Sequence, residues 1–103
     1  MTLMTRERDL QNAVLGLCKA FRLLAYHTHD SRRSQPGFPD LVIVGPRGVL
    51  YRELKTDTGR MRPEQVEWIE RLSDASQDAD VWRIRDWTSG RVKEELEAIR
   101  GVK

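Results

Sequence analysis

The chain has 103 residues, a formal net charge of +2 and 39% hydrophobic residues, so we expect one globular domain, residues 1–103. No apolar run is long enough to span a bilayer, and no signal-peptide pattern opens the chain. The single cysteine, Cys18, excludes an internal disulfide. These features favour a cytoplasmic protein that is neither membrane-bound nor stabilised by disulfides.

Hydrophobic spacing predicts the first elements in chain order. A helix is expected from Thr5, as its N-cap, to about Leu24. Its apolar residues recur at helical spacing: Leu10, Val14, Leu17, Cys18 and Phe21. A short strand at residues 23–28 and a polar loop at residues 30–36 are expected to follow.

Residues 37–55 predict a β-hairpin. Two apolar runs flank the turn sequence Gly-Pro-Arg-Gly at 45–48, where proline presets the backbone and the glycines relax it. If the turn has four residues, cross-strand partners have numbers that sum to 93. Asp40 then lies opposite Glu53, and Lys55 lies on the same side of the sheet as Glu53.

This register brings two carboxylates together. Like charges directly opposite one another destabilise a hairpin, and two of them about 4 Å apart repel by about 4 kcal/mol at an effective dielectric of about 20. A hard divalent cation with oxygen ligands offsets such repulsion. The alternative is a frayed strand start, with Asp40 in a turn and Glu53 and Lys55 on a solvated edge. The matching register favours a metal site.

The second half of the chain predicts two helices and a strand. Proline suits the first position of a helix at residues 63–75, because its missing N–H costs nothing there. Gln65 lies on the buried face of this helix and needs a polar partner. A short strand is expected at residues 81–84. Thr88 or Ser89 then caps a terminal helix that carries Val92, Leu96 and Ile99. This order of elements indicates an α/β fold around a mixed four-stranded sheet.

The sequence GFPDLVIV…YRELKTDTGRMRPEQVEWIERL resembles the VRR-NUC branch of the PD-(D/E)xK nuclease superfamily. The shared features are Pro-Asp at Asp40, Glu-x-Lys at Glu53 and Lys55, the following Gly59, and Gln65 in the next helix. The segments RERDLQNAV, HDSRRS and VWRIRDW are also similar to the family, so the resemblance covers about residues 6–87. The chain departs from the family at two loop positions, Ser76 and Ile84.

The resemblance implies a restriction-endonuclease-like core with a Mg²⁺ site, in which Mn²⁺ can substitute. Asp40 and Glu53 are expected to hold the ion, together with the backbone carbonyl of Leu54. Glu7 is expected to bind the metal, directly or through water. Its alternative role is an acid that complements the dipole of the first helix.

Two further residues receive catalytic roles. Lys55 is expected to orient the attacking water or to stabilise negative charge in the transition state. The resemblance implies that Gln65 hydrogen-bonds that water or Lys55; alternatively, it caps the hairpin edge.

Basic residues cluster around the hairpin in sequence. We expect them to contact DNA phosphates, although a solvated surface is the alternative for any single arginine. The predicted DNA-binding residues are Ser31, Arg32, Arg33, Arg60 and Arg62.

The function expected from these features is a Mg²⁺-dependent endonuclease that acts on branched DNA. The resemblance implies a Holliday (four-way) junction resolvase of phage or prophage type that acts as a homodimer. Three alternatives stay open: a non-catalytic DNA-binding subunit, a flap or duplex nicking nuclease, and a nuclease acting on RNA. No nucleotide-binding glycine motif occurs, so no nucleotide cofactor is expected.

Overall fold

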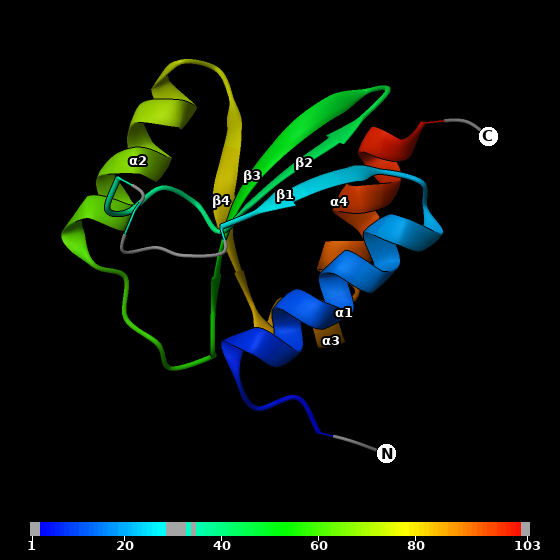
Figure 1. Cartoon of the computed structure of the whole chain (residues 1–103), viewed down its shortest axis with the longest axis horizontal. Coiled ribbons are helices and arrows are strands. Elements are labelled where there is room, and N and C mark those ends of the chain that lie inside the picture. Colours follow the sequence, from blue (N-terminus) through cyan, green and yellow to red (C-terminus); the bar gives the residue numbers. More distant parts are fainter. Residues whose placement is uncertain (1–2, 29–32, 34, 102–103) are drawn as a thin grey trace.

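The computed structural model describes residues 3–28, 33 and 35–101. Helices lie on both sides of one sheet: α2 stands alone on one side, and α1, α3 and α4 lie together on the other (Figure 1). In chain order the elements are α1 (Glu7–Ala20), β1 (Leu24–His27), β2 (Leu41–Gly45), β3 (Gly48–Lys55), α2 (Pro63–Asp74), β4 (Asp78–Arg83), α3 (Ile84–Thr88) and α4 (Arg91–Arg100). Among the described helices, none is both long and apolar enough to cross a membrane.

The sheet has the order β1-β2-β3-β4. β2 is antiparallel to both β1 and β3, and β4 is parallel to β3. A parallel pair needs a crossover connection, and α2 provides it. The predicted α/β fold with a mixed four-stranded sheet is therefore confirmed.

The hairpin of β2 and β3 has the register that the sequence predicts. Leu41 pairs with Arg52 and Gly45 pairs with Gly48, so partner numbers sum to 93. Pro46 and Arg47 form the tip of the turn. This register decides which side chains of β3 face the core and which face α2.

The hydrophobic core lies between the sheet and the three helices α1, α3 and α4. Alternate residues of each strand reach it, and these alternate with residues that face the α2 side. Its buried members are Leu10, Val14, Cys18, Leu23, Leu41, Ile43, Leu50, Leu54, Trp82, Val92, Leu96 and Ile99. Cys18 is a buried hydrophobic residue, as predicted, and burial raises the pKa of its thiol to about 11.

The first helix is shorter than predicted. Arg6, not Thr5, occupies the N-cap position, and the carboxylate of Asp9 accepts hydrogen bonds from the backbone N–H groups of both residues. The helix ends at Ala20 because the chain then turns, with Arg22 in the left-handed region at a φ of 59°. The predicted end at Leu24 was therefore wrong.

The last strand is longer than predicted at its start, and a helix was missed after it. β4 begins at Asp78, three residues before the predicted start at Val81, because the buried guanidinium of Arg52 binds both the carboxylate and the carbonyl of Asp78. The short helix α3 was not predicted. It begins where Asp86 accepts a hydrogen bond from the backbone N–H of Arg83 at 2.7 Å.

Candidate metal centre

Two carboxylates meet where β2 begins, beside β3. Asp40 directly precedes β2, and its Oδ2 atom accepts a hydrogen bond from the backbone N–H of Leu54 at 2.8 Å. Glu53 points to the α2 side of the sheet, because its neighbour Leu54 points into the core. Glu53 is buried, with 2% of its surface exposed. The hairpin register thus places the two carboxylates close enough to interact electrostatically.

Glu53 is held by neutral and cationic partners on one oxygen only. Its Oε2 atom accepts a hydrogen bond from Gln65 Nε2 at 2.8 Å and lies 3.9 Å from Lys55 Nζ. Its other oxygen, Oε1, is buried and has no hydrogen-bond partner within the described part of the chain. A buried acceptor without a partner costs free energy, and either a proton shared with Asp40 or a bound cation would remove that cost.

The electrostatic state of Glu53 reflects the same geometry. Burial is the main cause that raises its pKa, to about 8, and the neighbouring Asp40 raises it further. Lys55 opposes the shift, and Glu7 adds a smaller contribution in the raising direction. At neutral pH a carboxyl group in this position is therefore mostly protonated, unless a bound cation stabilises its ionised form.

Gln65 has a different partner from the one expected. Its Oε1 atom accepts a hydrogen bond from the backbone N–H of Arg62 at 2.9 Å, which caps the start of α2. Its Nε2 atom donates to Glu53. The amide therefore orients a carboxylate of the centre, whereas the sequence suggested a water, Lys55 or the hairpin edge as its partner.

Glu7 lies in the first turn of α1 and is exposed. It is close enough to affect the pKa of Glu53, but no described contact joins it to Asp40 or Glu53. Its predicted role as a metal ligand, and that of the Leu54 carbonyl, stay predictions.

The loop after Lys55 is fixed by a residue that the sequence reasoning missed. Arg83 follows the buried Trp82 and pairs with Lys55 in the parallel ladder. One of its guanidinium nitrogens donates to the carbonyls of Thr56 and Gly59, both at 2.7 Å. Strand alternation around Trp82 was the signal that could have placed Arg83 beside Lys55.

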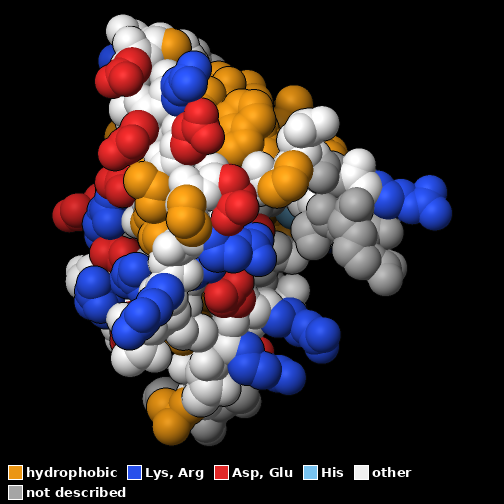
Figure 2. Space-filling view, turned by 90° about the vertical axis from the view of Figure 1, so that its left-hand side faces the viewer, with side chains coloured by type: hydrophobic (Ala, Val, Ile, Leu, Met, Phe, Trp, Pro, Cys, Tyr) orange, Lys and Arg blue, Asp and Glu red, His pale blue; other side chains and the backbone are white. Residues whose placement is uncertain are grey.

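The predicted DNA-binding residues fall into two groups. Arg33, Arg60 and Arg62 are exposed, and Lys and Arg side chains gather over the lower half of the α2 side of the molecule (Figure 2). Arg62 also lies 3.7 Å from Glu64. Ser31 and Arg32 lie outside the described residues.

The donor set fits Mg²⁺ better than a softer metal. Across residues 3–28, 33 and 35–101, no group of three or more His, Cys, Asp or Glu side chains gathers in a metal-binding arrangement. Asp40 and Glu53 therefore offer two carboxylate ligands, fewer than a complete protein coordination shell. Mg²⁺ keeps several waters and needs only one or two carboxylates, so this pair, with its unpartnered Glu53 oxygen, suits it.

Comparison with known proteins identifies the family of the chain. The family model described as "VRR-NUC domain" matches residues 3–86. The chain belongs to the VRR-NUC family. It is therefore a nuclease-family domain, and the family is typically metal-dependent. No curated protein matches the chain significantly.

Two solved structures share the fold, and a third match is more distant. A "VRR_NUC domain protein" has 20% sequence identity and a TM-score of 0.66, with 99% of this chain and 100% of that chain covered. A second structure, a "VRR_NUC domain", has 21% identity and a TM-score of 0.68, with 85% and 96% covered. A third is Hjc of Archaeoglobus fulgidus, described as a Holliday junction resolvase, with 22% identity, a TM-score of 0.49, and 77% and 66% covered.

Proposed function

We propose that this VRR-NUC domain is a Mg²⁺-dependent endonuclease that hydrolyses phosphodiester bonds of branched DNA, with four-way junctions as its preferred substrate and a homodimer as its active form. The observation that carries the proposal is Glu53: a buried carboxylate beside a second one, with an oxygen that no described residue satisfies. Such an arrangement is costly for a structural acid and suited to a cation site.

Asp40 and Glu53 would hold the metal ion. When bound, Mg²⁺ polarises phosphate oxygens and lowers the pKa of a coordinated water. Leu54 orients Asp40 through its backbone N–H, and Gln65 orients Glu53 through its amide. Both acids are therefore positioned before any substrate arrives, which reduces the reorganisation needed for catalysis.

Lys55 supplies a positive charge beside Glu53. It is 8% exposed, and its ammonium group lies near Glu53. From there it can orient the attacking water or stabilise the additional negative charge of the transition state. Arg83 supports this role because it fixes the loop that directly follows Lys55.

A second copy of the chain is the partner proposed for the uncovered part of the sheet. Leu24, Tyr26 and Val44 are exposed by 74%, 60% and 40%, and their pairing places all three on the α2 side of β1 and β2. An apolar patch that meets its own copy forms a two-fold interface, and a two-fold pair presents two sites to two strands of a junction.

Cleavage of a substrate panel tests the enzymatic part of the proposal. Labelled four-way junction, flap, duplex and single-stranded DNA, with an RNA duplex for comparison, are incubated with Mg²⁺, Mn²⁺ or EDTA. We expect metal-dependent cutting, fastest on the junction, and a loss of at least about 100-fold in Asp40→Asn. Glu97→Gln, an exposed change on α4, is the matched control and should cut normally. A wild-type protein that binds junctions but never cuts with either metal is a non-catalytic binding module.

The homodimer has its own test. Molecular mass in solution is measured by light scattering for the wild type and for Leu24→Asp, which places a charge in the proposed interface. We expect a wild-type dimer and a monomeric variant whose junction cleavage is weakened. A wild-type monomer that resolves junctions at full rate would remove the dimer from the proposal and leave the nuclease assignment intact.

A further inference from the structure

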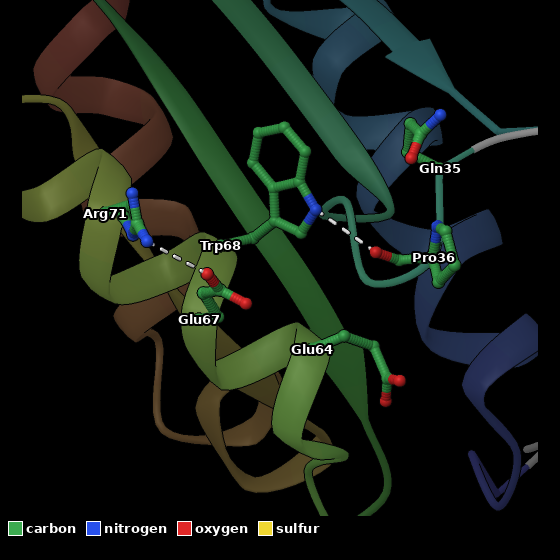
Figure 3. Close-up of a pocket in the computed structure, with 6 residues that line it drawn as sticks. All are labelled: Gln35, Pro36, Glu64, Glu67, Trp68 and Arg71. Carbon is green, nitrogen blue, oxygen red and sulfur yellow. Dashed lines mark hydrogen bonds and ion pairs between the residues drawn. The ribbon is translucent and has the colours of Figure 1, made fainter.

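A pocket of about 500 Å³ lies between α2 and the segment that leads into the metal centre (Figure 3). Its volume is in the usual range for small-ligand sites. Its walls are formed by Gln35, Pro36, Glu64, Glu67, Trp68 and Arg71. None of these residues belongs to the candidate metal centre, so the pocket is a separate feature.

Trp68 provides an aromatic wall that is already fixed in place. Its indole Nε1 atom donates a hydrogen bond to the carbonyl of Pro36 at 3.1 Å. The ring of Phe38 meets it edge-on, with centroids 5.0 Å apart and an angle of 85° between the planes. The indole is half-buried. A ring held in this way can stack on a planar ligand with little further loss of conformational freedom.

The polar groups of the pocket are mainly hydrogen-bond acceptors. The side chains of Glu64 and Glu67 are 44% and 63% exposed. Arg71 lies 3.2 Å from the carboxylate of Glu67, and Arg62 lies 3.7 Å from that of Glu64, so each negative charge has a cationic neighbour. The two carboxylates remain partly exposed acceptors, so a neutral ligand that donates N–H groups suits this wall.

The pocket and the metal centre share one turn of α2. Glu64 lines the pocket, and the next residue, Gln65, reaches to Glu53 of the metal centre. Gly37 keeps the connecting segment against the helix: its φ is +90°, and an added Cβ atom would lie 2.5 Å from the backbone carbonyl of Glu64. The pocket wall therefore lies one residue along α2 from the amide that orients Glu53.

We propose that this pocket binds one unstacked nucleobase that carries an exocyclic amino group, from the DNA strand held at the metal centre. The inference rests on the proposed nuclease function and specifies which part of the substrate the domain recognises. Trp68 stacks on the base, and the carboxylates of Glu64 and Glu67 accept hydrogen bonds from its amino group. A base must leave the stack to enter such a pocket, and this cost is smallest for an unpaired or single-stranded base.

Binding to short fluorescent oligonucleotides, followed by anisotropy in EDTA, tests the proposal without cleavage. We compare oligo-dC with oligo-dT, because thymine has no amino group. The expected result is several-fold tighter binding of oligo-dC, and about ten-fold weaker binding in Trp68→Ala, the size of one lost aromatic stack. Val66→Ala, an exposed change on the same helix, is the control and should bind as the wild type does.

Further variants keep the test decisive if Trp68→Ala folds poorly. Trp68→Phe retains a stacking ring and should keep most of the affinity. The double change Glu64→Gln with Glu67→Gln should reduce the preference for dC over dT. Equal affinities for dC and dT in the wild type, or equal affinities of Trp68→Ala and Val66→Ala, would overturn the proposal. A pocket that binds oligolysine through Trp68 but no oligonucleotide would indicate a protein partner and overturn it as well.

The outcome is separable from that of the nuclease assignment. If the wild type cuts junctions with Mg²⁺ while binding does not depend on Trp68, the base pocket fails and the nuclease stands. If binding depends on Trp68 but no substrate is cut, the nuclease fails and the pocket stands as a site for single-stranded nucleic acid.

Discussion

Replacing Glu53 with glutamine removes a buried carboxyl group whose ionisation lowers the free energy of unfolding. In the metal-free protein, burial and the nearby Asp40 raise the pKa of Glu53 from 4.5 to about 8. Between these two values the folded protein binds more protons than the unfolded chain. Its free energy of unfolding therefore falls as the pH rises through this window, and the contribution is fully present only below the unfolded pKa.

The size of this effect follows from the pKa difference. Integrated from about pH 5 to about pH 7.5, it corresponds to a loss of about 3 kcal/mol from the free energy of unfolding. Glu53→Gln has no titrating group at this position, and its amide oxygen can still accept the hydrogen bond from Gln65. We therefore expect the stability of the wild type relative to Glu53→Gln to fall by this amount over the same window.

Urea unfolding in EDTA at several pH values, followed by circular dichroism, measures this difference. The comparison with Glu53→Gln cancels the titration of groups far from the centre. Adding Mg²⁺ at the upper end of the window should stabilise the wild type, by about 2.7 kcal/mol at one hundred times its dissociation constant, and should stabilise Glu53→Gln much less. A stability difference that does not change with pH would show that the buried carboxylate is not under the strain described.

Three further predictions follow from other parts of the structure. Glu95→Ala leaves the buried Arg52 without a carboxylate that it contacts at 2.9 Å, so we expect a loss of about 2 to 4 kcal/mol in urea unfolding; Glu97→Ala should change stability by less than about 0.5 kcal/mol. Gly37→Ala should destabilise the protein by more than about 1 kcal/mol in thermal unfolding, because the new methyl group meets the backbone of α2 at 2.5 Å; Gly16→Ala, which meets nothing within 4 Å, should not. If Arg60 contacts a phosphate, Arg60→Gln should reduce the slope of log affinity against log salt by about 0.9, and an unchanged slope would place the DNA elsewhere.

The hairpin was predictable because local signals specify it. The turn sequence sets the register, and the register places Asp40, Glu53 and Lys55 on one side of the sheet. The position of Gln65 on the buried side of α2 was also readable from helical spacing. Its partner was not, because an amide can donate or accept, and only the packing of α2 on the sheet selects Glu53.

The elements that were missed depend on contacts between distant residues. Asp78 opens β4 although aspartate is rare in strands, because the guanidinium of Arg52 binds it from the neighbouring strand. Arg52, which the sequence analysis did not single out, is 2% exposed. Glu95 and Trp82 complete its surroundings: Glu95 pairs with it and the Trp82 ring lies 5.2 Å from its guanidinium carbon. No local pattern in the sequence predicts such a network.

The alternation of Arg52 and Glu53 along β3 limits how this gene segment can change length. Inserting a single amino acid in the strand just ahead of Arg52 would exchange the two side chains, sending a cation toward Asp40, the proposed metal ligand, and a carboxylate into the aliphatic interior. Inserting two would restore the original orientation at the expense of a local bulge. Lineages of this domain should therefore vary in length at the hairpin tip or after Lys55, and keep a constant spacing within the strand itself.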